Sequence, residues 1–336
     1  MIAEAEIAGA RRSAACKVVG LSVRTIERWH ARPGSDDRRH GPKRSPRNAL
    51  SRAEQARVVS VMTCPEHVAL SPKQLVPRLA DQGLYLASES TMYRLRRRLG
   101  LRVGAKASAR THVTRATTVH RATGPNQVWS WDITYLPTAV RGRFLYLYLV
   151  VDVWSRRIVG WQVHGRENPE LAAAMVARIC NESRIDSKGL VLHSDNGKPM
   201  RGSTMVSTLQ WLGIVPSFSR PHVSNDNPYS EALFRTLKHG PSYPRLPFAD
   251  GHAATQWVQC FVAYNTEHRH SAIRFVTPDE RHFAREHARL GARHSLYQRA
   301  RHNRPERWSR STRDWSPVGA VVLNPASDAS PTTNAA

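Results

Sequence analysis

The pattern of apolar and polar positions changes character near residue 124 of the chain. Before it, the dominant signals are helix starts and helix stops within polar, basic sequence. After it come runs rich in aromatic and β-branched residues near 128–136, 143–152 and 156–164, which predict strands. Helices and short strands then alternate up to about residue 218. The pattern predicts helical units followed by an α/β core with a βββαβα order.

The first helical unit is expected over residues 5–32, where Gly20 separates two helix-prone stretches and Ser22 can cap the second one. A short turn followed by a basic helix is typical of a helix-turn-helix, whose second helix enters the major groove of DNA. The residues expected to face DNA are Arg24, Thr25 and Arg28. The competing interpretation is a small helical hairpin that only packs.

A second helical unit is expected over residues 49–100. The stretches 51–54 and 71–74 both fit the S-x-x-E/Q capping box that begins many helices. A third helix carries Met92, Leu95 and Leu99 on its apolar side and turns its arginines outward. Arg94 and Arg97 are the expected DNA contacts, and a solvated basic face is the competing interpretation.

Three acidic residues stand out in the core. Asp132 lies within a predicted strand, Asp195 ends a short apolar strand, and Glu231 falls in the first turn of a helix that Asn227 can cap and Pro228 can begin. Carboxylates of this kind are the hard oxygen ligands that Mg²⁺ or Mn²⁺ prefers.

Two cations follow Glu231 on the same predicted helix face, Arg235 at i+4 and Lys238 at i+7. A carboxylate with cations beside it suits a site where a metal ion meets a phosphate chain. The competing interpretation of Lys238 is an ordinary solvated residue. His193 and Asn196 flank Asp195 and can either orient it or touch phosphate.

Other acids and histidines compete for the same role. Asp152 ends the second strand and is expected to pair with Arg156 or Arg157 instead of a metal. Asp226 precedes the helix cap and would point away from the face of Glu231. His268 and His270 are two positions apart, which does not share a helix face, so we interpret them as DNA-facing or structural.

These motifs resemble the three acidic motifs of DDE transposases and retroviral-type integrases. The resemblance rests on Trp131–Thr134, His193–Gly197 and the Asn227–Lys238 helix, with 35 residues between Asp195 and Glu231. It is strongest to the transposases of the "insertion sequence three" family and continues through Tyr264–Ala272 and Leu323-Asn324-Pro325.

The resemblance implies a ribonuclease H-like catalytic core with a mixed five-stranded sheet, preceded by all-α helix-turn-helix units. It also implies that Asp132, Asp195 and Glu231 are both catalytic residues and metal ligands, with two Mg²⁺ or Mn²⁺ ions. Lys238 is then expected to contact the transposon end. The implied partners are DNA, as terminal inverted repeats and as target, and further copies of the chain assembled on DNA.

Composition supports a nucleic-acid partner. The 336 residues include 50 Lys and Arg against 26 Asp and Glu, which gives a net charge of +24. Such a charge attracts polyanions, and no apolar run is long enough to span a membrane. The four cysteines form no CxxC pair, which argues against a zinc knuckle and a disulfide framework. We therefore expect a reduced, cytoplasmic protein associated with a bacterial nucleoid.

The expected organisation has five parts: a helix-turn-helix with a basic linker over 1–48, a second helical unit over 49–100, a basic linker over 101–123, the catalytic core over 124–288, and a basic, partly irregular tail over 289–336. The function expected from these features is metal-dependent DNA cleavage and strand transfer at the ends of an insertion sequence. A ribonuclease H-type nuclease and a DNA-binding regulator without catalysis are the alternatives.

Overall fold

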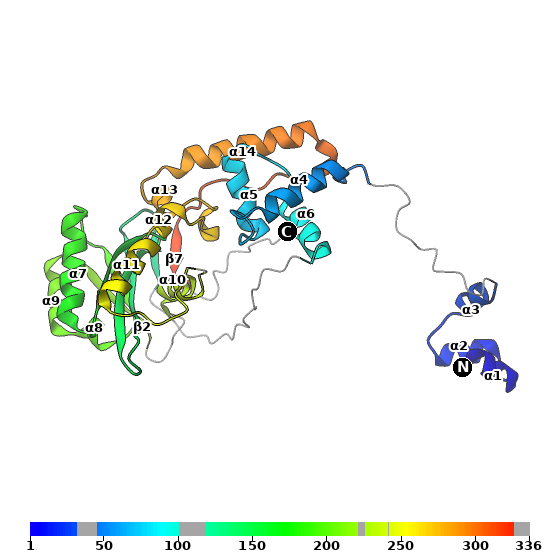
Figure 1. Ribbon diagram of the computed structural model, residues 1–336, viewed down its shortest axis with the longest axis horizontal. Helices are drawn as coiled ribbons and strands as arrows, with labels where there is room; N and C mark the ends of the chain where they lie inside the picture. The colour runs from blue at the N-terminus through cyan, green and yellow to red at the C-terminus, as the bar shows by residue number, and fades with distance from the viewer. Residues whose placement is uncertain (32–45, 101–118, 221–225, 241, 326–336) are drawn as a thin grey trace. The chain divides into compact units, whose positions relative to one another are not determined.

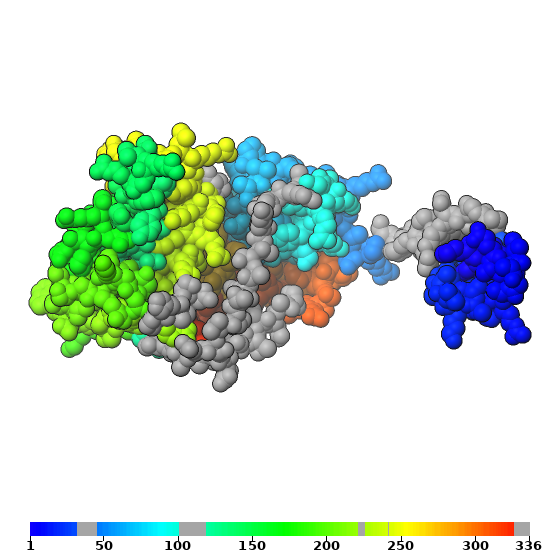
Figure 2. Space-filling view, turned by 90° about the horizontal axis from the view of Figure 1, so that it is seen from below, coloured from blue at the N-terminus to red at the C-terminus, as the bar shows by residue number. Residues whose placement is uncertain are grey.

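The computed structural model describes residues 1–31, 46–100, 119–220, 226–240 and 242–325, which are coloured in Figure 2. The chain forms two compact units, Met1–Ala49 and Leu50–Ala336. Most of the predicted linker over 101–123 falls outside the described residues. Among the described helices, none has the length and apolar character needed to cross a lipid bilayer.

The first unit contains three short helices, α1 (Ile2–Ile7), α2 (Arg12–Val18) and α3 (Val23–His30). Two sequence signals that separate α2 from α3 are confirmed. Gly20 adopts a positive φ of 68°, and the Ser22 hydroxyl accepts a hydrogen bond from the Thr25 N–H over 3.2 Å. Cys16 and Ile26 are the buried apolar side chains of this unit.

Helices α4 (Arg52–Thr63), α5 (Pro72–Asp81) and α6 (Glu89–Arg98) begin the second unit. Both predicted capping boxes are present at the starts of α4 and α5. Met92 and Leu95 of α6 are buried as expected, but Leu99 is 47% exposed. Leu99 sits at the C-cap, where the helix ends and its apolar stripe no longer faces the core.

The core of α4–α6 is shared with distant parts of the sequence. It includes Ile273, Val276, Leu290, Tyr297 and Trp315. Leu290 and Tyr297 belong to α14 (Glu286–Asn303), which Figure 1 shows in orange beside α5. The helical unit expected over 49–100 and the tail expected over 289–336 therefore bury their apolar side chains together.

A mixed sheet of five strands forms the centre of the second unit. Its strands are β2 (Val128–Pro137), β3 (Phe144–Asp152), β4 (Ile158–His164), β5 (Val191–Ser194) and β6 (Val215–Phe218), in the order β4-β3-β2-β5-β6. β2 pairs antiparallel with β3 and parallel with β5. This arrangement confirms the predicted ribonuclease H-like core and the strand positions on which it depended.

Helices cover both faces of this sheet (Figure 1). One face packs against α7 (Pro169–Glu182), α8 (Lys198–Arg201) and α9 (Ser203–Trp211). The other packs against α10 (Pro228–His239), α11 (Gly251–Phe261) and α12 (Tyr264–Glu267). A short 3₁₀ turn, η2 (Ser271–Ile273), then leads to α13 (Pro278–His282).

β4 is an edge strand, and side chains from two helices occupy part of its free edge. The Ile158 N–H donates to Asn265 Oδ1 over 2.8 Å, and Asn265 Nδ2 donates back to the Ile158 carbonyl over 2.9 Å. Farther along the strand, Arg178 of α7 donates to the Trp161 carbonyl over 3.4 Å. The Asn265 amide thus reproduces the pair of hydrogen bonds that a neighbouring strand would make.

A second, two-stranded sheet was not predicted. It pairs β1 (His120–Ala122) antiparallel with β7 (Val321–Leu323). β7 follows the 3₁₀ turn η3 (Pro305–Arg307) and the buried Trp315, so the C-terminal segment is more ordered than its polar sequence indicated. The pairing joins the entry of the catalytic core to residues about 200 positions later in the chain.

Candidate active site

Asp132 lies in the middle of β2, on the face of the sheet that α10 covers. Its neighbours Trp131 and Ile133 pack on the opposite face with α7 and α9, because successive residues of a strand point to opposite sides. The Ile133 N–H donates to Asp132 Oδ1 over 2.8 Å. The carboxylate is therefore held where β2 and α10 meet.

Asp195 follows directly after β5, the parallel neighbour of β2. The register of the two strands pairs Ser130 with His193, and each aspartate lies two residues beyond its member of that pair. The Gly197 N–H donates to Asp195 Oδ1 over 2.9 Å in the turn that follows. Parallel pairing thus brings Asp132 and Asp195 to neighbouring positions.

Glu231 is partly buried in the first turn of α10, as predicted, with Asn227 at the N-cap and Pro228 as the first helical residue. The Asn227 side chain, however, makes no capping hydrogen bond. It accepts from the Ser130 hydroxyl and donates to the Trp131 carbonyl over 3.0 Å. Asn227 therefore holds the start of α10 against β2, beside Asp132.

Asp195 and Glu231 act electrostatically on Asp132. Burial, followed by repulsion from Asp195, raises the pKa of Asp132 to about 7, and Glu231 and Glu167 add to the effect. Burial also raises the pKa of Glu231, against the attraction of Arg235. A carboxylate that is buried among other carboxylates is stabilised when a cation joins the group.

The chemistry of these residues fits a divalent cation, although they do not form a complete cage. In the part of the chain that the structure describes, no group of three or more His, Cys, Asp or Glu side chains forms a ready metal site. Mg²⁺ needs only one or two carboxylates, since it keeps several waters and takes substrate phosphate oxygens. Asp132 and Asp195 would hold the ion, and Glu231 would approach from α10.

Lys238 lies two turns along α10 from Glu231. Lys238 is exposed, and partial burial lowers the pKa of its ammonium group, against the attraction of Asp132. The attraction indicates that the Lys238 ammonium group lies near enough to Asp132 to interact with its carboxylate. Arg235 is exposed one turn closer to Glu231. Both cations therefore border the acidic residues, as their spacing predicted.

His193 is buried and its ring makes internal hydrogen bonds. Its Nδ1 lies 2.9 Å from the Ser217 hydroxyl, and its Nε2 lies 2.9 Å from the Asp226 carbonyl. A carbonyl only accepts, so Nε2 carries the proton, and burial lowers the pKa of the ring so that it stays neutral. This environment does not fit the predicted phosphate contact of His193 and favours the alternative, an orienting role.

Asn196 lies next to Asp195 and is partly buried. Its Nδ2 donates to the Ser219 carbonyl over 2.6 Å, while its Oδ1 is buried and accepts no hydrogen bond from the described residues. An oxygen acceptor of this kind does not attract phosphate, but it can receive a donor such as a water molecule. The DNA contact expected of Asn196 stays a prediction.

The two rival acids have structural partners. Asp152 is fully buried and accepts from the Asn126 N–H, the Ser155 N–H and the Ser155 hydroxyl, each over 2.7 Å. The predicted pairing of Asp152 with Arg156 or Arg157 is wrong, because Arg157 pairs with Asp279 and Arg156 stacks on the Tyr229 ring. These acceptor contacts fix the turn after β3.

Asp226 forms a two-pronged ion pair with Arg220, whose Nε and Nη2 each lie 2.8 Å from a carboxylate oxygen. The Asp226 carboxylate is thus engaged by a guanidinium group within the protein. His268 stacks on the Tyr264 ring with 4.6 Å between ring centres, and His270 Nδ1 accepts from the Ala272 N–H over 3.1 Å. Both histidines make structural contacts.

The candidate DNA-facing residues of the helical units lie on exposed surfaces. Arg24 and Arg28 are exposed on α3, and the Thr25 hydroxyl lies 2.8 Å from that of Ser22. Arg94 and Arg97 are exposed on α6, where Arg94 donates to the Thr91 hydroxyl over 3.0 Å. The structure leaves these guanidinium groups accessible to a phosphate backbone.

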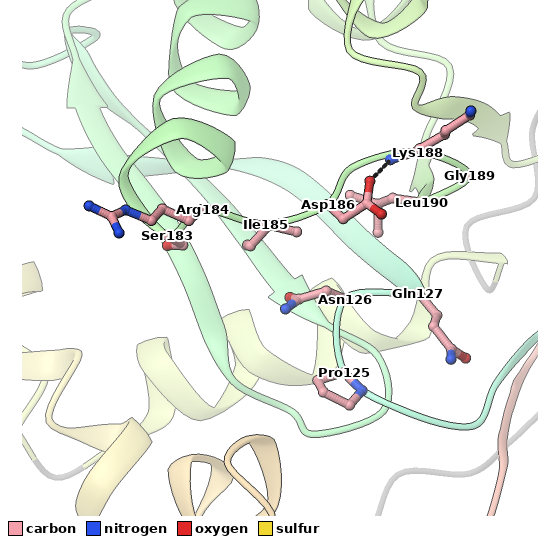
Figure 3. A pocket seen from close by; sticks show the side chains of 10 residues that line it. All are labelled: Pro125, Asn126, Gln127, Ser183, Arg184, Ile185, Asp186, Lys188, Gly189 and Leu190. Carbon is pink, nitrogen blue, oxygen red and sulfur yellow. Dashed lines mark hydrogen bonds between the residues drawn. The ribbon is translucent and has the colours of Figure 1, made fainter.

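A hollow of about 470 Å³ lies elsewhere on the core (Figure 3). Its lining comes from residues 125–127, 183–186 and 188–190, with Arg184 and Lys188 extending outward and Asp186 accepting from the Lys188 N–H. These residues precede β2 and β5, whereas Asp195 follows β5. The hollow is therefore at the opposite ends of these parallel strands from the acidic residues, and none of the predicted site residues lines it.

The same region of the chain matches known families. Residues 122–224 and 212–278 match two profiles that are both described as an integrase core domain. The chain is 33% identical over 169 residues to the transposase for insertion sequence element IS904 of Lactococcus lactis, covering 48% of this chain and 63% of that protein. It is 29% identical over 164 residues to the transposase InsF for insertion sequence IS3A of Escherichia coli, covering 47% and 54%.

Among solved structures, a chain of the simian T-cell lymphotropic virus intasome, in complex with a PP2A regulatory subunit, matches with 17% identity and a TM-score of 0.40. The match covers 63% of this chain and 74% of that one. The chain spans less than two thirds of the curated relatives named above. The predicted resemblance is confirmed: residues 122–278 match descriptions of an integrase core domain, and the curated relatives named above are insertion-sequence transposases.

Proposed function

We propose that this relative of the insertion-sequence transposases, built around an integrase core domain, cuts DNA at the ends of a mobile element and joins them to a target. The observation that carries the proposal is the placement of Asp132 on β2, Asp195 at the end of the parallel neighbour β5 and Glu231 in the first turn of α10. Burial, followed by repulsion from Asp195, raises the pKa of Asp132 to about 7. The three acids come from different parts of the fold. Among the described residues, no Lys or Arg forms an ion pair with Asp132 or Asp195.

When one or two Mg²⁺ ions are bound, they supply an activated water or 3′-hydroxyl and stabilise the leaving oxygen. Asp132 and Asp195 hold their carboxylates side by side through the β2–β5 pairing. Glu231 approaches from α10, and its position depends on how the helix start is fixed. Lys238 binds the phosphate next to the one being cut, because its ammonium extends from the same helix face.

Substrate recognition is assigned to the basic surfaces of the helical units. Arg24, Thr25 and Arg28 of α3, with Arg94 and Arg97 of α6, bind the terminal repeats. A net charge of +24 adds sequence-independent attraction that weakens with salt. Two copies bound to the two ends of one element would bring those ends together, which is the basis for proposing a homo-oligomer on DNA.

The test is cleavage of DNA that carries the element's ends, in Mg²⁺, followed on a sequencing gel. Asp132→Asn, Asp195→Asn and Glu231→Gln should each lower cleavage by about 10³-fold or more while end binding stays near normal, since an amide is a poor metal ligand. Cleavage that survives in one variant removes that residue from the active site.

The same gel separates the alternatives. Strand transfer products support a transposase, whereas cleavage of RNA–DNA hybrids without end joining supports a ribonuclease H-type nuclease. Sequence-specific binding with no metal-dependent nicking supports a regulator.

A further inference from the structure

The start of α10 is held by polar side chains from three different parts of the chain. The first contact is that of Asn227 with Ser130 and the Trp131 carbonyl on β2. The Ser130 hydroxyl also lies 2.6 Å from the hydroxyl of Ser230, the residue before Glu231. All three side chains are buried, so the contacts fix α10 relative to the strand that carries Asp132.

The second contact comes from β5. His193, two residues before Asp195, donates through Nε2 to the Asp226 carbonyl over 2.9 Å. Its Nδ1 then carries no proton and accepts a hydrogen bond from the Ser217 hydroxyl. The Ser217 oxygen in turn accepts a hydrogen bond from His120 Nε2 over 2.7 Å. This chain of bonds uses every donor once and joins β1, β6 and β5 to Asp226, two residues before the first residue of α10.

The third contact comes from the C-terminal segment. Asn324, directly after β7, donates through Nδ2 to the same Asp226 carbonyl over 2.9 Å. Tyr229, in the first turn of α10, donates its hydroxyl to the Val322 carbonyl over 3.3 Å. The Asp226 carbonyl thus accepts one hydrogen bond from the strand of Asp195 and one from the end of the chain.

From this convergence we propose that Asn324 is a positioning residue of the active site, which sets the approach of Glu231 toward the metal through the Asp226 carbonyl. The inference rests on the proposed function, because it assigns Asn324 a role only if Asp132, Asp195 and Glu231 bind a metal. It makes the C-terminal segment part of the catalytic apparatus, although Asn324 follows Glu231 by 93 residues.

The two informative variants are Asn324→Gly and Asn324→Asp. Asn324 has a positive φ of 53°, a conformation that glycine and aspartate tolerate and alanine does not. Glycine removes the amide, and aspartate keeps the shape while replacing the donor with an acceptor. The matched control is Asn303→Gly, at an exposed asparagine at the end of α14.

Metal binding is measured on the full chain with Tb³⁺, a hard ion that oxygen ligands prefer. Its luminescence is sensitised by a nearby tryptophan, and Trp131 is adjacent to Asp132 in β2. Removing a side chain that supports metal ligands should weaken Tb³⁺ binding by about tenfold in both Asn324 variants, with Asn303→Gly unchanged. The Mg²⁺ concentration needed for half-maximal cleavage should rise by the same factor.

Thermal melts are recorded in parallel, and the titrations are made well below each midpoint. Normal Tb³⁺ affinity in the Asn324 variants, with or without a lowered midpoint, overturns the proposal. Complete unfolding of both variants overturns it too, because the asparagine would then be a requirement of the fold. Failure of the proposed function is distinct: Asp132→Asn and Glu231→Gln would then leave the Tb³⁺ signal unchanged.

Discussion

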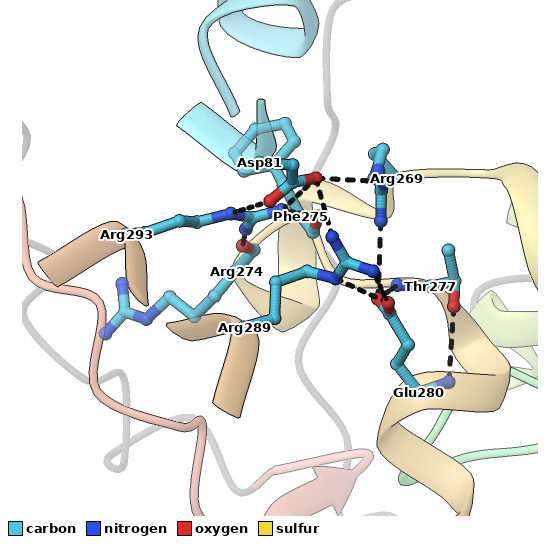
Figure 4. Close-up of polar contacts among 8 residues, drawn as sticks. All are labelled: Asp81, Arg269, Arg274, Phe275, Thr277, Glu280, Arg289 and Arg293. Carbon is cyan, nitrogen blue, oxygen red and sulfur yellow. Dashed lines mark hydrogen bonds and ion pairs between the residues drawn. The ribbon is translucent and has the colours of Figure 1, made fainter. Parts of the chain in front are cut away.

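Two groups of acids in the second unit have opposite electrostatic surroundings. In the arginine cluster (Asp81, Arg269, Glu280, Arg289 and Arg293; Figure 4), each acid is matched by guanidinium groups. Arg293 donates to both oxygens of Asp81 over 2.7 and 3.0 Å, and Arg269 and Arg289 each pair with both Asp81 and Glu280. In the proposed catalytic group (Asp132, Asp195 and Glu231), Asp132 and Asp195 lie beside each other, and neither has such an ion pair with the residues that the structure describes.

The difference shows what each group does. The arginine cluster joins α5 to α14, to α13 and to Arg269, and both of its carboxylates are matched by internal guanidinium groups. The catalytic group is supported by neutral side chains instead, the amide of Asn227, the hydroxyls of Ser130 and Ser230 and the imidazole of His193. These uncharged side chains hold β2, β5 and α10 together, and they leave the negative charge of the carboxylates available to a bound cation.

The largest expected effect on stability comes from breaking the arginine cluster. Asp81→Asn should lower the free energy of unfolding by about 3–5 kcal/mol, because it leaves the fully buried Arg293 without its carboxylate. Urea unfolding measures the change. Glu182→Gln, which breaks the exposed pair with Arg178, is the control and should change it by less than about 1 kcal/mol. Equal effects in both variants would contradict the contrast drawn here.

A smaller effect of opposite sign is expected at the catalytic group. The pKa of Asp132 is about 7 in the folded protein, above its value in the unfolded chain. Between about pH 4 and 7 the metal-free folded state therefore holds a proton that the unfolded state has lost. Its free energy of unfolding falls as the pH rises through that range. Asp132→Asn removes this loss and should stabilise the metal-free protein at pH 8 by about 1–3 kcal/mol. Melting with EDTA at pH 5 and pH 8 measures it; a difference that does not grow with pH refutes it.

Lys238 tests the border of the catalytic group. Lys238→Ala should lower end cleavage by about 10–30-fold, an effect of roughly 1.4–2 kcal/mol on the barrier. Lys238→Arg should keep much of the activity, since phosphate requires a positive charge here more than a fixed geometry. Cleavage rates beside a thermal melt decide the matter, and an alanine variant with the normal rate removes Lys238 from the site.

The smallest effects on DNA binding are expected on α6, where the exposed Arg94 and Arg97 lie close in the sequence to Arg96, which makes a structural hydrogen bond. Arg94→Ala and Arg97→Ala should each weaken DNA binding a few-fold and reduce the salt dependence by about one phosphate contact. Arg96 donates to the Leu70 carbonyl over 2.9 Å, so Arg96→Ala should lower the melting temperature more than the affinity. Filter binding at several salt concentrations, with melts, separates the two kinds of arginine.

The sequence predicted those features whose signal is local. β2, β5 and α10 were found because apolar runs, Gly197 and the Asn227-Pro228 pair mark their limits, and the ribonuclease H-like order followed from them. The side-chain role of Asn227 was missed because an asparagine at a helix start indicates a cap, whereas its partners lie 96 and 97 residues earlier.

Long-range contacts were missed for the same reason. Asp81 and Arg293 are 212 residues apart, and β1 and β7 are short segments whose pairing depends on the rest of the fold.

The core shared by α4–α6 and α14 also affects the choice of fragments for experiments. A fragment ending at residue 123, the boundary expected before the catalytic core, would expose Leu75, Val76 and Met92. The first unit, 1–49, is therefore the better fragment for DNA-binding measurements.

The hydrogen bonds of Asn265 with Ile158 bear on how the protein behaves at high local concentration. Proteins that gather on one DNA molecule reach high local concentrations, and an open sheet edge would then invite strand-to-strand joining and aggregation. At Ile158 the amide of Asn265 already fills both hydrogen-bonding groups, and Arg178 takes the Trp161 carbonyl. If copies assemble on DNA as proposed, these contacts make strand-to-strand joining at this part of the β4 edge unfavourable.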